Sequence, residues 1–215
     1  MSTVIMLVVC VVVTSLLAGT NYLTAERIER NNILQEENAR ADVLKMADSF
    51  KPIDMDSDGE TDYYEGYNGD DLVGYVMTTS AKGYGGDVSV MTGILFDGKI
   101  NKIAILSHSE TPGLGANADT ESFTNRFKQV IGENNLEVVK GGGASDGQID
   151  AITGATITST AVTNAVNEAI DIFRSVTKDK KNNASDGTAS NNGNDKGSDG
   201  TESKNPSDKE ADVNG

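Results

Sequence analysis

Residues that can carry redox or metal chemistry by themselves are almost absent from this sequence. Its 215 residues include one cysteine, Cys10, one histidine, His108, and no tryptophan. A single cysteine excludes a disulfide framework, a Cys-x-x-Cys motif and the cysteine spacings that hold iron–sulfur clusters. A single histidine excludes metal centres built from several histidines. Any electron transfer by this chain must therefore use a bound cofactor.

Positive charge is also scarce. Lys and Arg together number 18 against 33 Asp and Glu, which gives a formal net charge of −15. The phosphates of a nucleic acid would be repelled by such a chain, so we expect no nucleic-acid partner. Much of the acidity lies in linker or low-complexity sequence and bears on solubility more than on the fold.

One long apolar run lies at the N-terminus, from Val4 to Leu17 and on toward Leu23. About 20 residues suffice to cross a bilayer as a helix, which predicts a transmembrane anchor over residues 1–23. The alternative is a cleaved signal peptide, but the usual basic segment before the run is missing. Cys10 lies inside the run, which excludes a lipoprotein signal. Arg27 and Arg30 follow it, so charge alone does not fix the orientation.

Residues 24–52 are expected to form a helical linker. Glu26 to Met46 is rich in Glu, Arg, Asn, Ala and Leu, with scattered apolar positions. This composition predicts a helix that rises from the membrane and ends before Pro52, because proline disfavours helix in the residue before it.

An acidic segment, Asp54 to Glu65, matches the pattern of an EF-hand calcium loop. Its carboxylates are Asp54, Asp56, Asp58, Glu60, Asp62 and Glu65. Against calcium stand Thr61 where an aliphatic residue is usual, the lack of a second loop, and a strand rather than a helix from Tyr63 onward. A solvated acidic turn explains the same residues.

Alternating and β-branched residues predict strands over Leu72–Thr79, Val88–Phe96 and Ile100–Ser107, the last two joined by a hairpin turn. A short strand is predicted at Leu136–Val139. Helical spacing predicts a helix over Asp119–Ile131 and another from about Ile157 to Phe173. Residues 53–177 therefore predict an α+β domain, an antiparallel sheet with flanking helices.

Residues 178–215 differ in composition from the rest. They are mostly Asn, Asp, Gly, Ser, Lys and Thr, with no aromatic residue and no Leu or Ile. Such a segment buries too little apolar surface to offset the entropy of ordering it. We expect a disordered polar tail.

The stretch from Asp150 to Ser159 joins a glycine-rich polar segment to the last predicted helix. Gly154 and the threonines around it lie at or just before that helix N-terminus, where free N–H groups and the helix dipole favour an anion. A plain interpretation is a helix start with several possible caps, namely Thr153, Thr156 and Thr158.

Asp150-Ala-Ile-Thr-Gly-Ala-Thr156, followed by Thr158-Ser159, resembles the flavinylation motif of the FMN-binding domain family. The resemblance implies that Thr156 carries FMN through a phosphoester bond and that a flavin transferase reads Asp150 during maturation. Thr153 stands where the family more often has serine, which keeps the hydroxyl. Gly154, Ala155 and Thr158 complete the implied binding residues.

A second segment, Ser107 to Ala116, follows the third predicted strand. Its Glu-Thr-Pro-Gly-Leu-Gly sequence resembles a segment of the RnfG family of Rnf complexes and of the related NqrC family of sodium-pumping quinone reductases, and Lys82 to Gly86 resembles another. We expect this segment to line the flavin, with glycines that allow close backbone approach. The alternative is an ordinary surface connection with a turn at Pro112-Gly113. The residues expected there are Glu110, Thr111, Gly113, Leu114 and Gly115.

The length of the chain suits the RnfG family better than the longer NqrC family. The resemblance implies one subunit of an ion-translocating oxidoreductase, which relays electrons through covalent FMN. It also implies a single-pass anchor in the cytoplasmic membrane, the FMN domain on the outer face, and the other subunits as partners. No Gly-x-Gly-x-x-Gly follows a predicted strand, so we expect no direct NAD site. No acid/base pair or nucleophile indicates independent catalysis.

Two alternatives remain at this stage. One is a free-standing extracellular flavoprotein that shares Thr156 and the anchor. The other is a non-redox anchored surface protein, with calcium bound through Asp54 to Glu65. The residues do not indicate the transported ion, the flavin potential or the direction of electron flow.

Overall fold

The computed structural model describes residues 2–55, 61 and 63–186. The first helix, α1 (Ser2–Val43), is continuous. Its part from Ser2 to Ala25 is long and apolar enough to cross a membrane, and its side chains are exposed. The expected N-terminal apolar helix is therefore present. The helix predicted over Glu26–Met46 is the second part of α1, which ends at Val43, before Pro52, where Val43 and Leu44 become fully buried.

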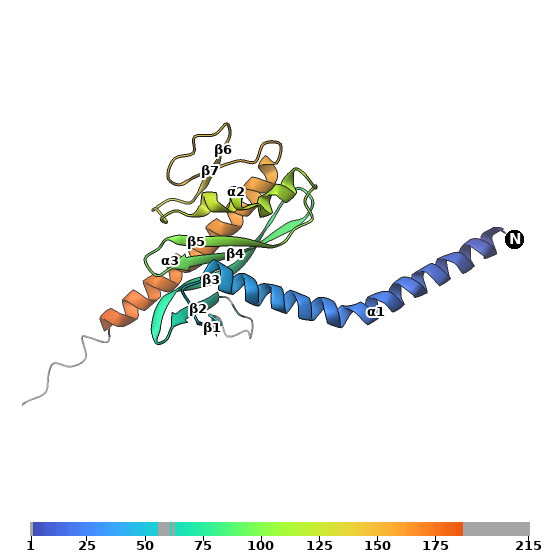
Figure 1. The fold of residues 1–215 in the computed structure, drawn as a ribbon, viewed down its shortest axis with the longest axis horizontal. Coiled ribbons are helices and arrows are strands. Elements are labelled where there is room, and N and C mark those ends of the chain that lie inside the picture. Colours follow the sequence, from blue (N-terminus) through green and yellow to red (C-terminus); the bar gives the residue numbers. More distant parts are fainter. Residues whose placement is uncertain (1, 56–60, 62, 187–215) are drawn as a thin grey trace, which may run out of the picture. The chain divides into compact units, whose positions relative to one another are not determined.

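A five-stranded antiparallel sheet forms the domain, in the simple order β1-β2-β3-β4-β5 (Figure 1). The strands are β1 (Ser49–Ile53), β2 (Tyr63–Asn68), β3 (Asp71–Lys82), β4 (Asp87–Leu95) and β5 (Ile100–Ser107). The three strands predicted between Leu72 and Ser107 are confirmed. β1 was missed because it contains Pro52, which an edge strand accommodates without loss of an inner ladder bond.

One face of the sheet packs against α3 (Thr156–Asp186). This helix begins one residue before the predicted start at about Ile157. The helix presents small and branched residues at helical spacing, Ala161, Val162, Ala165, Val166 and Ala169. They bury Tyr75, Met77, Val90 and Ile94 of β3 and β4 in the main core. The Thr79 hydroxyl donates to the carbonyl of Ala165 at 2.7 Å, which satisfies a buried polar group inside this layer.

The other face is covered by the last turns of α1. Val43 and Leu44 pack on Val76 and Met91 in a second, smaller cluster. The Arg40 guanidinium lies over the Tyr64 ring, 3.5 Å from its centroid. Asp42 accepts from Lys102 of β5, and that contact holds the pKa of Asp42 below its usual value despite some desolvation. The end of α1 is thereby fixed to the sheet.

Between β5 and α3 the chain forms short elements: η1 (Gly115–Asp119), α2 (Glu121–Thr124), η2 (Asn125–Phe127), β6 (Glu137–Val139) and β7 (Gln148–Asp150). The helix predicted over Asp119–Ile131 is confirmed only for residues 121–127, as α2 and η2, and its predicted continuation to Ile131 is wrong. Phe123 and Phe127 are buried as that pattern requires, but residues 129–131 are extended. They exchange backbone hydrogen bonds with Gly98 and Ile100 beside edge strand β5, which a helix cannot do.

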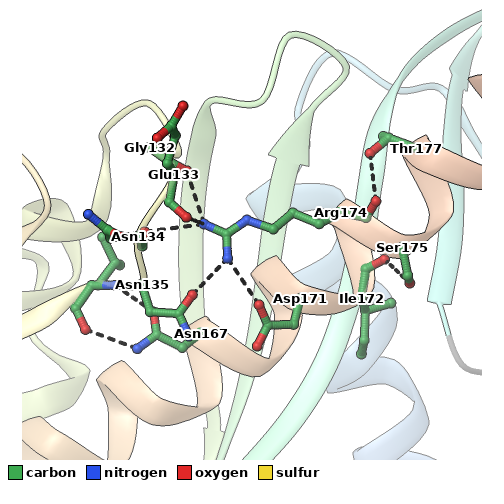
Figure 2. Close-up of polar contacts among 11 residues, drawn as sticks. Gly132, Glu133, Asn134, Asn135, Asn167, Asp171, Ile172, Arg174, Ser175 and Thr177 are labelled. Atoms are coloured by element: carbon green, nitrogen blue, oxygen red, sulfur yellow. Dashed lines mark hydrogen bonds and ion pairs between the residues drawn. The ribbon is translucent and has the colours of Figure 1, made fainter.

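The parallel pair β6 and β7 is anchored to α3 through residues 132–136 (Figure 2). Arg174 donates to the carbonyls of Gly132, Glu133 and Asn134 at 3.0–3.2 Å, and to Asn135 Oδ1 at 2.7 Å. It also pairs with Asp171 at 3.0 Å. The Asn167 amide satisfies both backbone groups of Leu136, at 2.8 and 3.0 Å. Hydrogen bonds from α3 therefore fix residues 132–136, where the segment that leads to Asp150 begins.

The acidic segment lies between β1 and β2 rather than between helices. Four of its carboxylates, Asp56, Asp58, Glu60 and Asp62, fall outside the described residues. Glu65 is buried in β2 and accepts from the Tyr67 hydroxyl at 2.6 Å. The calcium site stays an untested prediction.

The predicted α+β class is confirmed. α3 continues past Thr177 to Asp186, so the first part of the expected tail is helical. Residues 187–215 lie outside the described part of the chain.

We predict that replacing Arg174 by Lys destabilises the domain by about 1–3 kcal/mol, because lysine cannot serve several carbonyls at once. Urea unfolding measures the loss, and hydrogen exchange should show faster exchange at residues 132–136. Asp171→Asn is the matched control: it removes only a half-exposed ion pair and should change stability little. Equal effects of the two variants would contradict this role of Arg174.

Candidate functional site

Three segments that are distant in the sequence meet in one pocket of about 620 Å³. They are the loop between β3 and β4, the segment after β5, and the start of α3. We call this the site pocket. Its lining residues are Tyr84, Glu110, Thr111, Leu114, Gly115, Gly154, Ala155, Thr156, Ile157 and Thr158. Its size lies within the range that buries small ligands and cofactors.

The turn before α3 shapes one wall of the pocket. Gly154 has φ +79°, which few residues with a side chain adopt, and an added Cβ would lie 3.3 Å from Leu114 Cδ2. Ser159 is buried, and its hydroxyl accepts the Ile152 N–H at 2.9 Å. This contact folds the turn back against the helix, so that Thr156, the first residue of α3, faces the pocket.

The threonine hydroxyls near this turn differ in what they bind. Thr158 is 1% exposed and donates to Glu110. Thr160 is exposed and donates to the Thr156 carbonyl at 2.9 Å. Thr153 is exposed and does not line the pocket. Thr156 is half-buried, and within the described residues its hydroxyl has no hydrogen-bond partner. Of these four threonines in the described chain, Thr156 is the one that offers an uncommitted hydroxyl to the pocket.

Glu110 is a buried carboxylate, 6% exposed, that lines the site pocket. Oε1 accepts the Gly85 N–H at 2.9 Å, and Oε2 accepts the Thr158 hydroxyl. Burial raises the pKa of Glu110, but these hydrogen bonds, a contribution from the Tyr84 backbone and nearby His108 more than offset it. The pKa is lowered overall, and Glu110 is ionised at neutral pH.

Glycines surround the Glu110 side chain because no larger residue fits. A Cβ on Gly83 would lie 2.4 Å from Glu110 Oε1, and one on Gly115 would lie 2.5 Å from Oε2. On Gly85 a Cβ would lie 2.0 Å from the Ser109 carbonyl oxygen. These glycines permit the close packing of the two loops around the carboxylate. The close neighbour of Gly115 is therefore Glu110, whereas the sequence led us to expect a ligand there.

Exposed apolar side chains rim the pocket. Tyr84 is 73% exposed, Leu114 46% and Ile157 57%, and each comes from a different one of the three segments. Tyr84 and Ile157 were not among the predicted site residues. Two features of the sequence could have indicated them. Tyr84 is an aromatic residue within the glycine-rich segment Lys82–Gly86, and Ile157 is an apolar residue directly after Thr156.

Most of the predicted binding residues come together in the pocket. Those that line it are Glu110, Thr111, Leu114, Gly115, Gly154, Ala155, Thr156 and Thr158. Gly113 and Thr153 do not. Gly113 has φ +77° and open space where a Cβ would lie, which is the geometry of a turn.

Asp150 lies apart from the site pocket, at the end of β7. Its Oδ2 accepts weakly from the Ala144 N–H at 3.4 Å, and Arg126 donates to its backbone carbonyl. The side chain borders a separate recess of about 300 Å³, together with Arg126, Lys128 and Gln129. Asp150 is therefore a few residues before the turn that precedes α3 and does not line the pocket.

Comparison with known proteins identifies both parts of the chain. The family model of the FMN-binding domain matches residues 83–171, and that of the RnfG N-terminal region matches residues 2–43. The RnfG protein of the Na(+)-translocating ferredoxin:NAD(+) oxidoreductase complex of Acetobacterium woodii is 38% identical over 189 residues, covering 81% of this chain and 91% of the relative. The chain belongs to the RnfG family.

A second relative and a solved structure are also similar to the chain. The RnfG protein of the proton-translocating ferredoxin:NAD(+) oxidoreductase complex of Clostridium ljungdahlii is 34% identical over 164 residues, covering 76% of this chain and 85% of the relative. The two names specify different ions, so family membership does not determine the ion. The solved structure is NqrC of the Na(+)-translocating NADH-quinone reductase from Parabacteroides distasonis. It is 26% identical with a TM-score of 0.43, covering 49% of this chain and 57% of that one.

The family makes this chain one component of an ion-translocating ferredoxin:NAD(+) oxidoreductase complex, as the sequence predicted. The resemblance stated from three short segments is confirmed. The two alternatives, a free-standing flavoprotein and a non-redox surface protein, receive no support from the relatives.

We predict that the contribution of Glu110 to stability depends on pH. Because its folded pKa lies below the ordinary value of 4.5, the ionised carboxylate stabilises the fold above that pH. This stabilisation is lost as the pH falls through the folded pKa. The melting temperature of the natural chain should therefore exceed that of Glu110→Gln at neutral pH, and the difference should shrink below about pH 4.5. A difference that stays constant or widens on acidification would contradict this.

We predict that Gly115→Ala disrupts the pocket, since the new Cβ would lie 2.5 Å from Glu110 Oε2 and 2.6 Å from Thr158 Oγ1. Overpacking of this kind costs about 1–3 kcal/mol, measurable by urea unfolding. Gly132→Ala is the matched control, because a Cβ there meets open space. Equal stability of the two variants would show that the contact around Gly115 relaxes freely.

Proposed function

We propose that this chain relays electrons through FMN that is joined to Thr156 by a phosphoester bond. The observation that carries the proposal is the uncommitted Thr156 hydroxyl, half-buried in the site pocket at the first turn of α3. The hydroxyls of Thr158 and Thr160 are hydrogen-bonded, and Thr153 lies outside the pocket. Among the threonines around the start of α3, Thr156 is therefore the one best placed to receive the phosphate.

The site suits the charge of the product. A phosphodiester on Thr156 keeps one negative charge, and it would lie at the N-terminus of a 31-residue helix. Free N–H groups and the helix dipole stabilise an anion at that position. When the bond forms, Thr156 Oγ1 would bond to the FMN phosphorus of a flavin dinucleotide and lose its proton, the phosphoanhydride bond would break, and the nucleoside monophosphate would leave. A flavin transferase would bind that dinucleotide and catalyse the transfer.

The pocket also suits the flavin ring. Tyr84, Leu114 and Ile157 offer exposed apolar surface at the rim. FMN would supply the electron-carrying chemistry that the side chains lack. The residues that would hold it are those of the site pocket, with Thr111 and the backbone of Gly154 and Ala155 as polar neighbours.

Asp150 is proposed as a residue that the transferase reads rather than a flavin contact. Its side chain borders a recess next to the attachment turn and is separate from the pocket lining. A transferase that binds this recess would approach Thr156 from the protein surface.

We further propose that α1 anchors the chain in the cytoplasmic membrane, with the FMN domain on the outer face. The apolar part, Ser2–Ala25, is long enough to span a bilayer. A covalent bond would prevent loss of the flavin outside the cell. The other subunits of the complex would donate and accept the electrons, and NAD would be bound elsewhere.

We predict that Thr156→Val abolishes covalent flavin while the domain stays folded. Valine has the same shape but no oxygen to bond to phosphorus. The chain is produced together with a flavin transferase and examined for in-gel flavin fluorescence and intact mass, with circular dichroism as a check of folding. Thr160→Val, one turn further along α3, is the matched control and should be fully loaded. Fluorescent Thr156→Val would refute the assignment.

A further inference from the structure

We propose that Glu110 is a positioning residue that assembles the site pocket and whose fixed negative charge lowers the reduction potential of the flavin. The inference rests on the proposed function, because it concerns FMN held next to Thr156. Glu110 would act on the cofactor through the geometry and the charge of its surroundings and not by bonding to it.

The first step is the geometry of the contacts. Gly85 is 25 residues before Glu110 and Thr158 is 48 residues after it, yet one carboxylate accepts from both. We call these three residues the Glu110 clamp. Each of the pocket's three segments contributes one member, so the clamp connects them all.

The second step is the choice of side chain. The partners of the carboxylate are donors, namely the Gly85 N–H, the Thr158 O–H and the Tyr84 backbone. Glutamine has the same shape, but its N–H₂ could face Thr158 only if that hydroxyl turned from donating to accepting, and the remaining contact to the Gly85 N–H would lose its charge assistance. The Gly83 and Gly115 backbones fit closely around the carboxylate, which leaves little room for it to turn away. The clamp therefore favours an ionised acid at this position, which accepts from every donor without rearrangement.

The third step is the charge. Among the described residues, no Lys or Arg forms an ion pair with Glu110, and His108 is the charged or titratable group that acts on it. The negative charge is stabilised by dipoles but is not cancelled. Reduction adds electrons to the flavin, and a nearby fixed negative charge opposes that addition. The sign follows directly: removing the charge should raise the midpoint potential.

Glu110→Gln in the full-length chain tests both parts of the proposal. In flavin-free protein, produced without transferase, hydrogen exchange should become faster at residues 83–86 and 110–116 while strands β3 and β4 keep their protection. In flavin-loaded protein, redox titration should show a midpoint potential shifted to a more positive value. Glu121→Gln is the matched control: it removes the same charge from an exposed position in α2 and should change neither measurement.

Thr158→Val separates the two effects. It removes one donor of the clamp but keeps the charge, so the same segments should exchange faster without a positive shift in potential. If Glu110→Gln does not fold, the exchange of Thr158→Val decides the positioning role. Loss of FMN loading in a folded Glu110→Gln, with normal loading of Glu121→Gln, would also support that role.

Several results would overturn the inference. If Glu110→Gln has the hydrogen-exchange rates and the flavin midpoint potential of the natural chain, both the positioning role and the effect of the charge are refuted. Faster exchange with an unchanged potential would reduce Glu110 to a structural residue. If the natural chain carries no FMN, the proposed function fails, but the exchange comparison in flavin-free protein still decides whether Glu110 assembles the pocket.

Discussion

A buried carboxylate must be surrounded by donors or it destabilises the fold, and Glu110 meets this constraint with donors from two other segments. Satisfying it brings the β3–β4 loop, the segment after β5 and the start of α3 to one place. The glycines at 83, 85 and 115 follow from the same constraint, because any Cβ there would collide with the carboxylate or the backbone beside it. The pocket is thus a consequence of how one charge is accommodated.

The rest of the domain holds these segments in register. α3 packs its small residues on β3 and β4, which holds the helix that begins at Thr156 against the sheet. Arg174 and Asn167, on the same helix, fix the chain that leads to Asp150 (Figure 2). On the opposite face of the sheet, the end of α1 packs on Val76 and Met91. The helix that begins with the apolar N-terminal segment therefore ends in the core of the domain. A single helix therefore connects the proposed membrane anchor to the sheet.

Local patterns predicted the elements whose side chains show clear periodicity. The strands from Leu72 to Ser107 and the helix after Thr156 are of this kind, and the family resemblance indicated which loops meet. Features that depend on tertiary contacts were not predictable. β1 contains a proline that only its edge position tolerates, and residues 129–131 are extended because edge strand β5 offers hydrogen bonds. The burial of Glu110 was also hidden, since its partners are 25 and 48 residues away.

The most direct test is a mass measurement on the natural full-length chain produced with a flavin transferase. Intact mass gives the number of covalent flavins, and fragmentation of the peptide that contains residues 150–160 locates the attachment. We expect one FMN per chain, on Thr156. A chain without covalent flavin, or one with FMN on Thr153, Thr158 or Thr160, would contradict the role assigned to the Thr156 hydroxyl.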